Sequence, residues 1–131
     1  TYASKITNLK PVYYKNEEPT LRLYVRNKNW SPTIYTVASQ NITTTPIDNA
    51  YFKVIRIVDE LDIISYGTGS ANKEYSRLSY DVSGNYFNLD MSLFEPGYMY
   101  GVKFAYYVNN DYQEQQEIFK FRVESTGTAK L

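Results

Sequence analysis

Apolar and polar residues alternate along much of this 131-residue chain at the two-residue period of a β-strand. Residues 21–26 show the pattern in short form, with Leu21, Leu23 and Val25 on one face. The longest alternating run spans residues 98–108, and one face of it carries Tyr98, Tyr100, Val102, Phe104, Tyr106 and Val108. Helical periodicity is nearly absent, so the pattern predicts an all-β protein.

Turn residues divide the pattern into short strands, as at Asp59-Glu60 and at Asn109-Asn110-Asp111. We predict about eight strands, at residues 21–26, 33–37, 51–58, 61–66, 75–80, 86–91, 98–108 and 118–123. Short strands at this spacing are typical of an immunoglobulin-like β-sandwich. We expect a single domain over residues 1–124, followed by a flexible tail or linker over residues 125–131.

The entry to the longest strand resembles a tyrosine corner. Phe94 is followed by Pro96 and Gly97, and a tyrosine-rich strand begins directly after them. In such a corner a tyrosine hydroxyl bonds to the backbone a few residues upstream and ties the strand to its preceding loop. We predict that Tyr100 has this structural role.

The charge balance excludes two classes of partner. The chain has 14 Lys and Arg residues and 14 Asp and Glu residues, so its formal net charge is zero. Nucleic-acid binding needs a basic surface that displaces counterions, and binding to an anionic membrane needs a polybasic segment. The sequence also lacks an apolar run of about 18 residues that could span a bilayer. We therefore expect neither nucleic acid nor membrane as a partner.

The residue types restrict catalysis even more. The chain contains no His and no Cys, which excludes Ser–His and Cys–His nucleophiles and thiolate or imidazole metal ligands. The acidic residues Asp59, Glu60 and Asp62 fall where a turn is predicted, and their spacing is not that of a calcium loop. We expect no catalytic residues, no metal and no cofactor, and hence a protein that is not an enzyme.

The aromatic surplus is the strongest candidate for a binding function. The chain has 15 Tyr, 6 Phe and 1 Trp, and a core face accounts for only part of them. We predict a candidate contact surface made of the aromatic residues on loops or outer faces, namely Tyr13, Tyr14, Tyr24, Trp30, Tyr35, Tyr107 and Tyr112. Rigid amphipathic rings bury area at low entropic cost and are common in interfaces. Two alternatives stay open: outer tyrosines can simply stabilise a sheet by cross-strand pairing, and Trp30 can be a core residue.

A family resemblance rests on four segments, residues 21–38, 78–91, 94–106 and 119–124. Together they resemble C-terminal domains of structural proteins in the virions of large tailed bacteriophages. The resemblance implies a non-enzymatic component of the virion, as a capsid decoration, neck or tail protein. It also implies that the partners are other virion proteins in a multi-copy assembly. Residues 94–106 are separately similar to strands of fibronectin type III and immunoglobulin-like domains, which concerns the fold alone.

The alternative function is a β-sandwich module that binds carbohydrate or a host surface. In that case exposed aromatic rings stack on sugar faces, and glycan takes the place of a protein partner. The sequence does not separate the two, because both functions use exposed aromatic side chains on the same fold.

Overall fold

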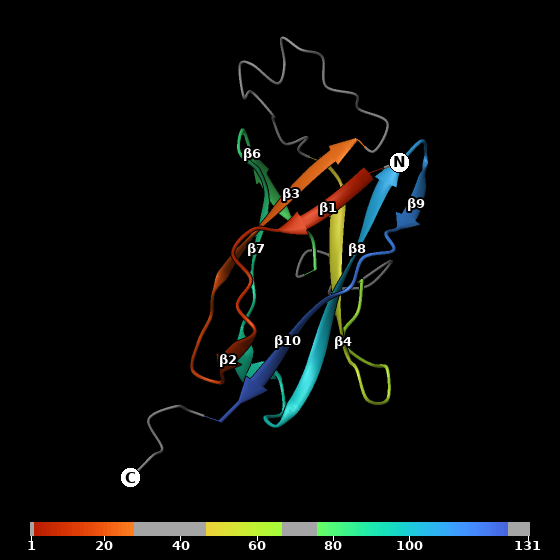
Figure 1. Cartoon of the computed structure of the whole chain (residues 1–131). Helices are drawn as coiled ribbons and strands as arrows, with labels where there is room; N and C mark the ends of the chain where they lie inside the picture. The colour runs from red at the N-terminus through yellow and green to blue at the C-terminus, as the bar shows by residue number, and fades with distance from the viewer. Residues whose placement is uncertain (1, 28–46, 67–75, 126–131) are drawn as a thin grey trace.

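The computed structural model describes residues 2–27, 47–66 and 76–125, and these residues form a two-layer β-sandwich (Figure 1). The elements in chain order are β1 (Tyr2–Ile6), β2 (Val12–Tyr14), β3 (Thr20–Asn27), β4 (Ala50–Arg56), β5 (Leu61–Ile64), β6 (Ser79–Asp81), β7 (Gly84–Asn88), the 3-10 helix η1 (Met91–Leu93), β8 (Tyr98–Val108), β9 (Asp111–Glu114) and β10 (Phe119–Glu124). The predicted all-β sandwich is confirmed, with ten strands in the described residues in place of about eight.

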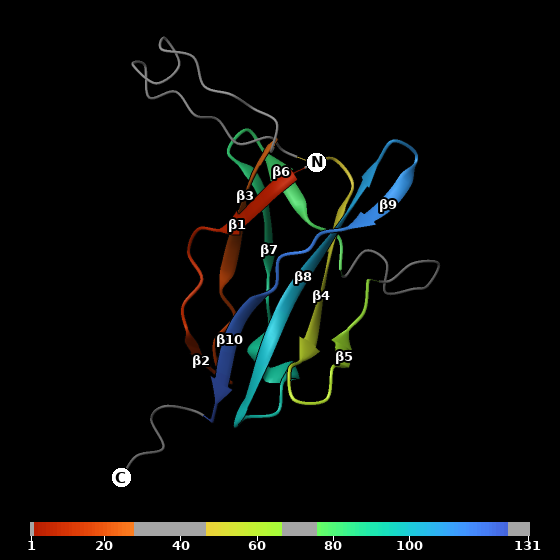
Figure 2. The same cartoon turned by 45° about the vertical axis from the view of Figure 1, so that its right-hand side comes forward.

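One sheet has four strands in the order β1-β3-β7-β6, and the other has six. The six-stranded sheet runs β2-β10-β8-β4-β5, with β9 also paired to β8, and Figure 2 shows this sheet toward the viewer. The long strand β8 organises it, because β4 pairs along one edge while β10 and β9 share the other edge end to end. The strand pairs are antiparallel except for β2 and β10, which run parallel.

The core lies between the two sheets and is built from the alternating faces that the sequence predicts. On β8 the inward residues Tyr100, Val102, Phe104 and Tyr106 are fully buried. Across the interlayer space, the rings of Phe52 on β4 and Phe87 on β7 stack with their centroids 4.5 Å apart. Burial of these large side chains is the main contribution to the stability of the sandwich.

Tyr100 makes the hydrogen bond that a tyrosine corner requires. Its hydroxyl donates to the carbonyl oxygen of Glu95 over 2.6 Å. The ring packs against Phe94, with centroids 4.9 Å apart, and Gly97 has a positive φ of 92° that turns the chain into β8. Burial raises the pKa of the Tyr100 hydroxyl, so the group remains a donor at neutral pH.

The observed elements differ from the predicted ones in a few places. The strand predicted at 86–91 ends at Asn88, because the Asp90 carboxylate accepts a hydrogen bond from the Ser92 N–H and begins η1. The strand predicted at 118–123 is found as β10, and β9, which follows the Asn109-Asn110 turn, was not predicted. Strands β1 and β2 were not predicted, since they form by pairing with the distant strands β3 and β10. The strand predicted at 33–37 lies outside the described residues.

Candidate functional site

The prediction that Tyr13 belongs to a contact surface is wrong. Tyr13 is only 1% exposed, although its neighbours Val12 and Tyr14 are exposed. Its ring packs edge-on against Phe121, and its hydroxyl accepts a hydrogen bond from the Lys10 N–H over 2.9 Å. Strand β2 runs beside β10, so alternate residues of β2 point into the sandwich, and the sequence of the short strand does not show this partner.

The other predicted contact residues fall into separate places. Tyr14 is exposed on β2 and Tyr24 is half-buried on β3 of the other sheet. Trp30 and Tyr35 lie outside the described residues. Among the described ones, Tyr107 and Tyr112 come together, since they are directly opposite each other in the β8–β9 hairpin. Among the predicted contact residues that the structure describes, this aromatic pair is the one brought together.

This pair belongs to the outer face of the six-stranded sheet, which is the face pointing away from the core. The Tyr107 and Tyr112 rings lie 4.8 Å apart, and the Tyr112 ring also lies 5.7 Å from that of Tyr51 on β4. Tyr107 and Tyr112 are 39% and 42% exposed, whereas Tyr51 is almost completely buried. The hairpin turn that carries this cluster uses Asn109 and Asn110, whose φ angles of 55° and 64° suit a tight two-residue turn.

Charged residues occupy the middle of the outer face. Lys53 and Lys103 are direct cross-strand neighbours on β4 and β8, a pairing that would repel without a counter-charge. Glu114 on β9 supplies it, at 3.3 Å from Lys103 and 3.8 Å from Lys53. The Lys53 ammonium lies over the Tyr66 ring, 5.2 Å from its centroid. The Tyr66 hydroxyl donates a hydrogen bond to the Glu114 carboxylate over 2.9 Å.

The ionisation of this network follows from its contacts. Burial opposes the charge of Glu114, but the hydrogen bond from Tyr66 and the charges of Lys103 and Lys53 outweigh it and lower the pKa of the carboxyl. Burial and the nearby Glu114 carboxylate raise the pKa of the Tyr66 hydroxyl. At neutral pH the centre of the face is thus a compensated ion network with a neutral phenol.

Aliphatic side chains cover the third part of the outer face, around Gly101 of β8. A Cβ atom at Gly101 would lie 2.7 Å from Ile118 Cγ2 and 3.0 Å from Ile57 Cδ1, so glycine lets both side chains lie directly on the sheet. Ile55, opposite Gly101 on β4, is 9% exposed beneath them. Met99 and Ile118 remain open to solvent here, at 38% and 42% exposed.

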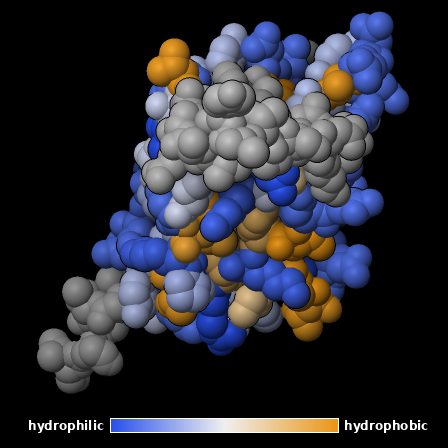
Figure 3. Space-filling view, turned by 45° about the horizontal axis from the view of Figure 1, so that its top comes forward, coloured by the Kyte–Doolittle hydropathy of each residue, from blue (hydrophilic) through white to orange (hydrophobic). Residues whose placement is uncertain are grey.

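The two outer faces of the sandwich differ in chemistry. On the four-stranded sheet, Arg22 stacks over the Tyr86 ring at 5.0 Å and pairs with Asp81 at 2.8 Å. That face is polar, as expected for a sheet that faces water. Figure 3 shows hydrophobic residues reaching the surface in clusters between hydrophilic ones in its view of the molecule.

Sequence reasoning missed Tyr51, Lys53, Ile55 and Gly101 as parts of this face. One signal was present, because the segment 51–58 has apolar residues on both faces of its strand. That pattern is typical of a central strand, which β4 is, and Tyr51 and Ile55 of its second apolar face lie on the outer side of the sheet. An apolar cluster on an outer face is the consequence.

The described residues offer no arrangement for metal chemistry. Within them, no group of three or more Asp and Glu side chains is placed to hold a metal ion. The described part of the chain also contains no helix of the length and apolarity that crossing a bilayer requires.

Comparison of the chain with protein-family models, with curated proteins and with solved structures found no match. The resemblance to virion proteins therefore stays a prediction.

Proposed function

We propose that this chain is a non-enzymatic structural protein of a tailed-phage virion, which binds neighbouring subunits through the outer face of its six-stranded sheet. The observation that carries the proposal is the apolar character of this face. On this face Tyr107 and Tyr112 are 39% and 42% exposed, and Met99 and Ile118 are 38% and 42% exposed. The choice of a virion as the assembly rests on the resemblance of four segments to virion proteins.

The composition of the face fits a protein interface. Exposed tyrosine, methionine and isoleucine side chains are enriched in the centres of interfaces, where they bury much area per ordered side chain. Here the Tyr107 and Tyr112 rings lie together, and Met99 and Ile118 are exposed on the same face around Gly101. Exposed apolar side chains rimmed by polar residues on a folded domain are typical of an interaction site.

The charges between the two clusters are compatible with burial in a complex. Lys53 and Lys103 are neutralised by Glu114, and Asp62 lies 3.7 Å from Lys53. A charge that already has its partner adds less desolvation cost on binding than an isolated one. The face therefore combines two apolar contact areas with a polar centre that fixes the orientation of a partner.

The test compares two tyrosines of similar exposure on different sheets. We expect Tyr112→Ser to reduce co-sedimentation of the chain with virions about tenfold, because about 1.4 kcal/mol of contact energy is lost. Tyr80→Ser, on β6 of the four-stranded sheet and 49% exposed, is the matched control and should leave co-sedimentation unchanged. Equal loss in both variants, or no association of the wild-type chain with particles, contradicts the proposal.

A carbohydrate-binding module is the alternative, since the Tyr107 and Tyr112 rings would also suit a sugar face. A glycan array with the purified chain separates the two functions. Saturable binding by the monomer that Tyr112→Ser abolishes would favour the glycan module over the virion protein.

A further inference from the structure

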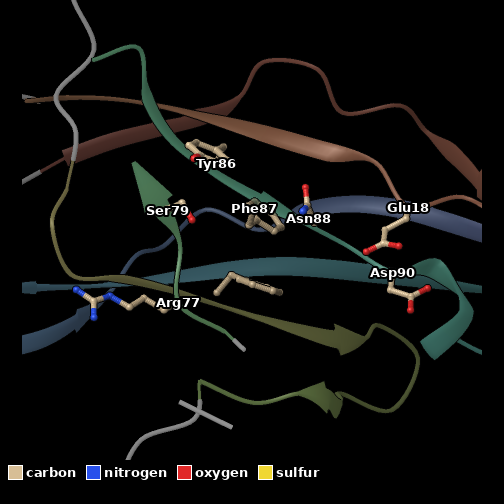
Figure 4. Close-up of a pocket in the computed structure, with 8 residues that line it drawn as sticks. Glu18, Arg77, Ser79, Tyr86, Phe87, Asn88 and Asp90 are labelled. Carbon is tan, nitrogen blue, oxygen red and sulfur yellow. The ribbon is translucent and has the colours of Figure 1, made fainter. Parts of the chain in front are cut away.

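A groove opens on the side of the sandwich where β6 ends, and we call it the edge groove. It has a volume of about 310 Å³ and is lined by residues of both sheets, among them Phe52, Tyr86, Phe87 and Asn88 (Figure 4). This volume lies at the lower limit of ligand sites, which occupy about 300 to 1,000 Å³. The stacked Phe52 and Phe87 rings are buried at its base, so its shape is fixed by the core.

The edge groove exposes the backbone edge of β7. Tyr86, Phe87 and Asn88 are consecutive, and their side chains alternate between the two faces of the sheet, yet all three line the same groove. Strand β6 pairs with β7 only as far as Tyr86, which lies opposite Ser79. Beyond that pair, no strand of the described residues continues the sheet on this side.

The backbone direction at Asn88 agrees with this geometry. The N–H of the next residue, Leu89, donates to the carbonyl oxygen of Pro19 on the β3 side over 3.0 Å. Because successive N–H groups of a strand point to opposite sides, the N–H of Asn88 points toward the groove. It meets no acceptor among the described residues.

Two other strand edges of the sandwich are closed by carboxylates. Glu17 accepts the Tyr14 N–H of β2 over 2.7 Å, and Glu117 accepts the Ser4 N–H of β1 over 3.1 Å. A side chain that bonds to the free backbone N–H of an edge strand in this way prevents another chain from pairing with that strand. The edge of β7 at Asn88 lacks such a cap in the described part of the chain, which singles it out as a site for strand addition.

We propose that the edge groove binds an extended segment of a neighbouring subunit, which pairs with β7 in line with β6 and places a Lys or Arg side chain between Glu18 and Asp90. The inference rests on the proposed function, because it names the segment that a partner in the assembly would supply. Strand addition gains affinity from main-chain hydrogen bonds and specificity from side-chain positions.

The charges around the groove determine the chemistry of that segment. Glu18 and Asp90 lie at one end and Arg77 at the other (Figure 4). Neither carboxylate forms an ion pair with a described residue, and the Asp90 carboxylate accepts from the N–H and the hydroxyl of Ser92, at 3.0 and 2.7 Å. Arg77 is held by Asn49 Oδ1 at 2.8 Å. A basic side chain therefore complements the end with Glu18 and Asp90.

The test uses two capped octapeptides of alternating residues, one of threonine and lysine and one of threonine and glutamate, titrated into the ¹⁵N-labelled chain. We expect the lysine peptide to shift the amide signals of Tyr86, Phe87 and Asn88, and the glutamate peptide to shift none of them. Glu18→Gln should weaken binding of the lysine peptide about tenfold, because it removes one of the two carboxylates.

A pair of substitutions at Asn88 separates the backbone from the side chain. Asn88→Pro removes the N–H that faces the groove, at a position where an edge strand tolerates proline, and should abolish binding. Asn88→Ala keeps the N–H and should bind normally, although it loses the hydrogen bond from the Thr20 hydroxyl. Equal binding of both peptides, or binding that Glu18→Gln leaves intact, overturns the inference even if Asn88→Pro fails to fold.

The result is independent of the test of the proposed function. A chain that sediments with virions but binds no peptide at β7 would refute the edge groove alone. A chain that binds the lysine peptide but does not associate with particles would refute the virion assignment and leave strand addition in place.

Discussion

Replacing Tyr100 by phenylalanine tests whether the loop before β8 is tied to the sandwich by one hydroxyl. The side chain is fully buried, and its hydroxyl donates to the Glu95 carbonyl over 2.6 Å. Phenylalanine keeps the ring contacts with Phe94 and Phe121, so the substitution removes little besides the hydrogen bond. A buried hydrogen bond contributes about 1 kcal/mol net, and a carbonyl left without its donor adds to the loss. We expect Tyr100→Phe to lower the free energy of unfolding by about 1 to 2 kcal/mol.

Urea denaturation followed by tryptophan or tyrosine fluorescence measures this loss. The midpoint should fall while the m-value stays unchanged, and the melting temperature should fall by about 3 to 5 °C for each kcal/mol in a chain of this size. The control is Tyr107→Phe, because Tyr107 is 39% exposed and its hydroxyl bonds to no described residue. If Tyr100→Phe is as stable as the wild type and as Tyr107→Phe, the hydroxyl does not hold the corner and the reasoning fails.

Two further substitutions test the polar contacts. Asn85 is fully buried, and its side-chain amide donates to the Ile47 carbonyl and accepts from the Ile47 N–H, both over 2.8 Å. We expect Asn85→Ala to lower the free energy of unfolding, measured by urea denaturation, by about 3 kcal/mol. A loss smaller than that of Tyr100→Phe would contradict this expectation. Glu114→Gln should lower stability by less than about 1 kcal/mol at pH 7, since the carboxylate is partly exposed. Because folding lowers the pKa of Glu114, its contribution is present above the usual glutamate pKa of about 4.3 and disappears as the pH falls below it. The wild type and Glu114→Gln should therefore differ at pH 7 and converge at about pH 3, and a constant difference would refute the role of the charge.

The fold followed from the sequence where a strand's pattern is strong enough to stand alone. Strand β8 was predicted with its correct bounds and core face, because its alternation extends over 11 residues. The strand at 21–26 was found for the same reason. Strand β2 was missed, since three residues carry no measurable period and their burial depends on a parallel partner about 110 residues away. Short strands of this kind are determined by tertiary pairing rather than by local pattern.

The candidate site was less predictable than the fold. Outer aromatic residues could be counted from the sequence, but their grouping depends on register across β8, β9 and β4. Register brings Tyr107 opposite Tyr112 and places Lys53 beside Lys103, and neither relation has a local signature. The edge groove was not predicted at all, because it exists only where β6 stops pairing before β7 ends.

Among the described residues, the most buried and the most exposed tyrosines differ in the partners of their hydroxyls. Buried phenols need a hydrogen-bond partner, and each of the three most buried has one: Tyr100 with Glu95, Tyr106 with the Ser4 hydroxyl at 2.6 Å, and Tyr13 with the Lys10 N–H. These residues are accounted for by the fold. The hydroxyls of Tyr107 and Tyr112 bond to no described residue, and their rings face solvent on the apolar sheet. A high tyrosine count is therefore no sign of binding by itself, and the exposed, unbonded hydroxyls are those available to a partner.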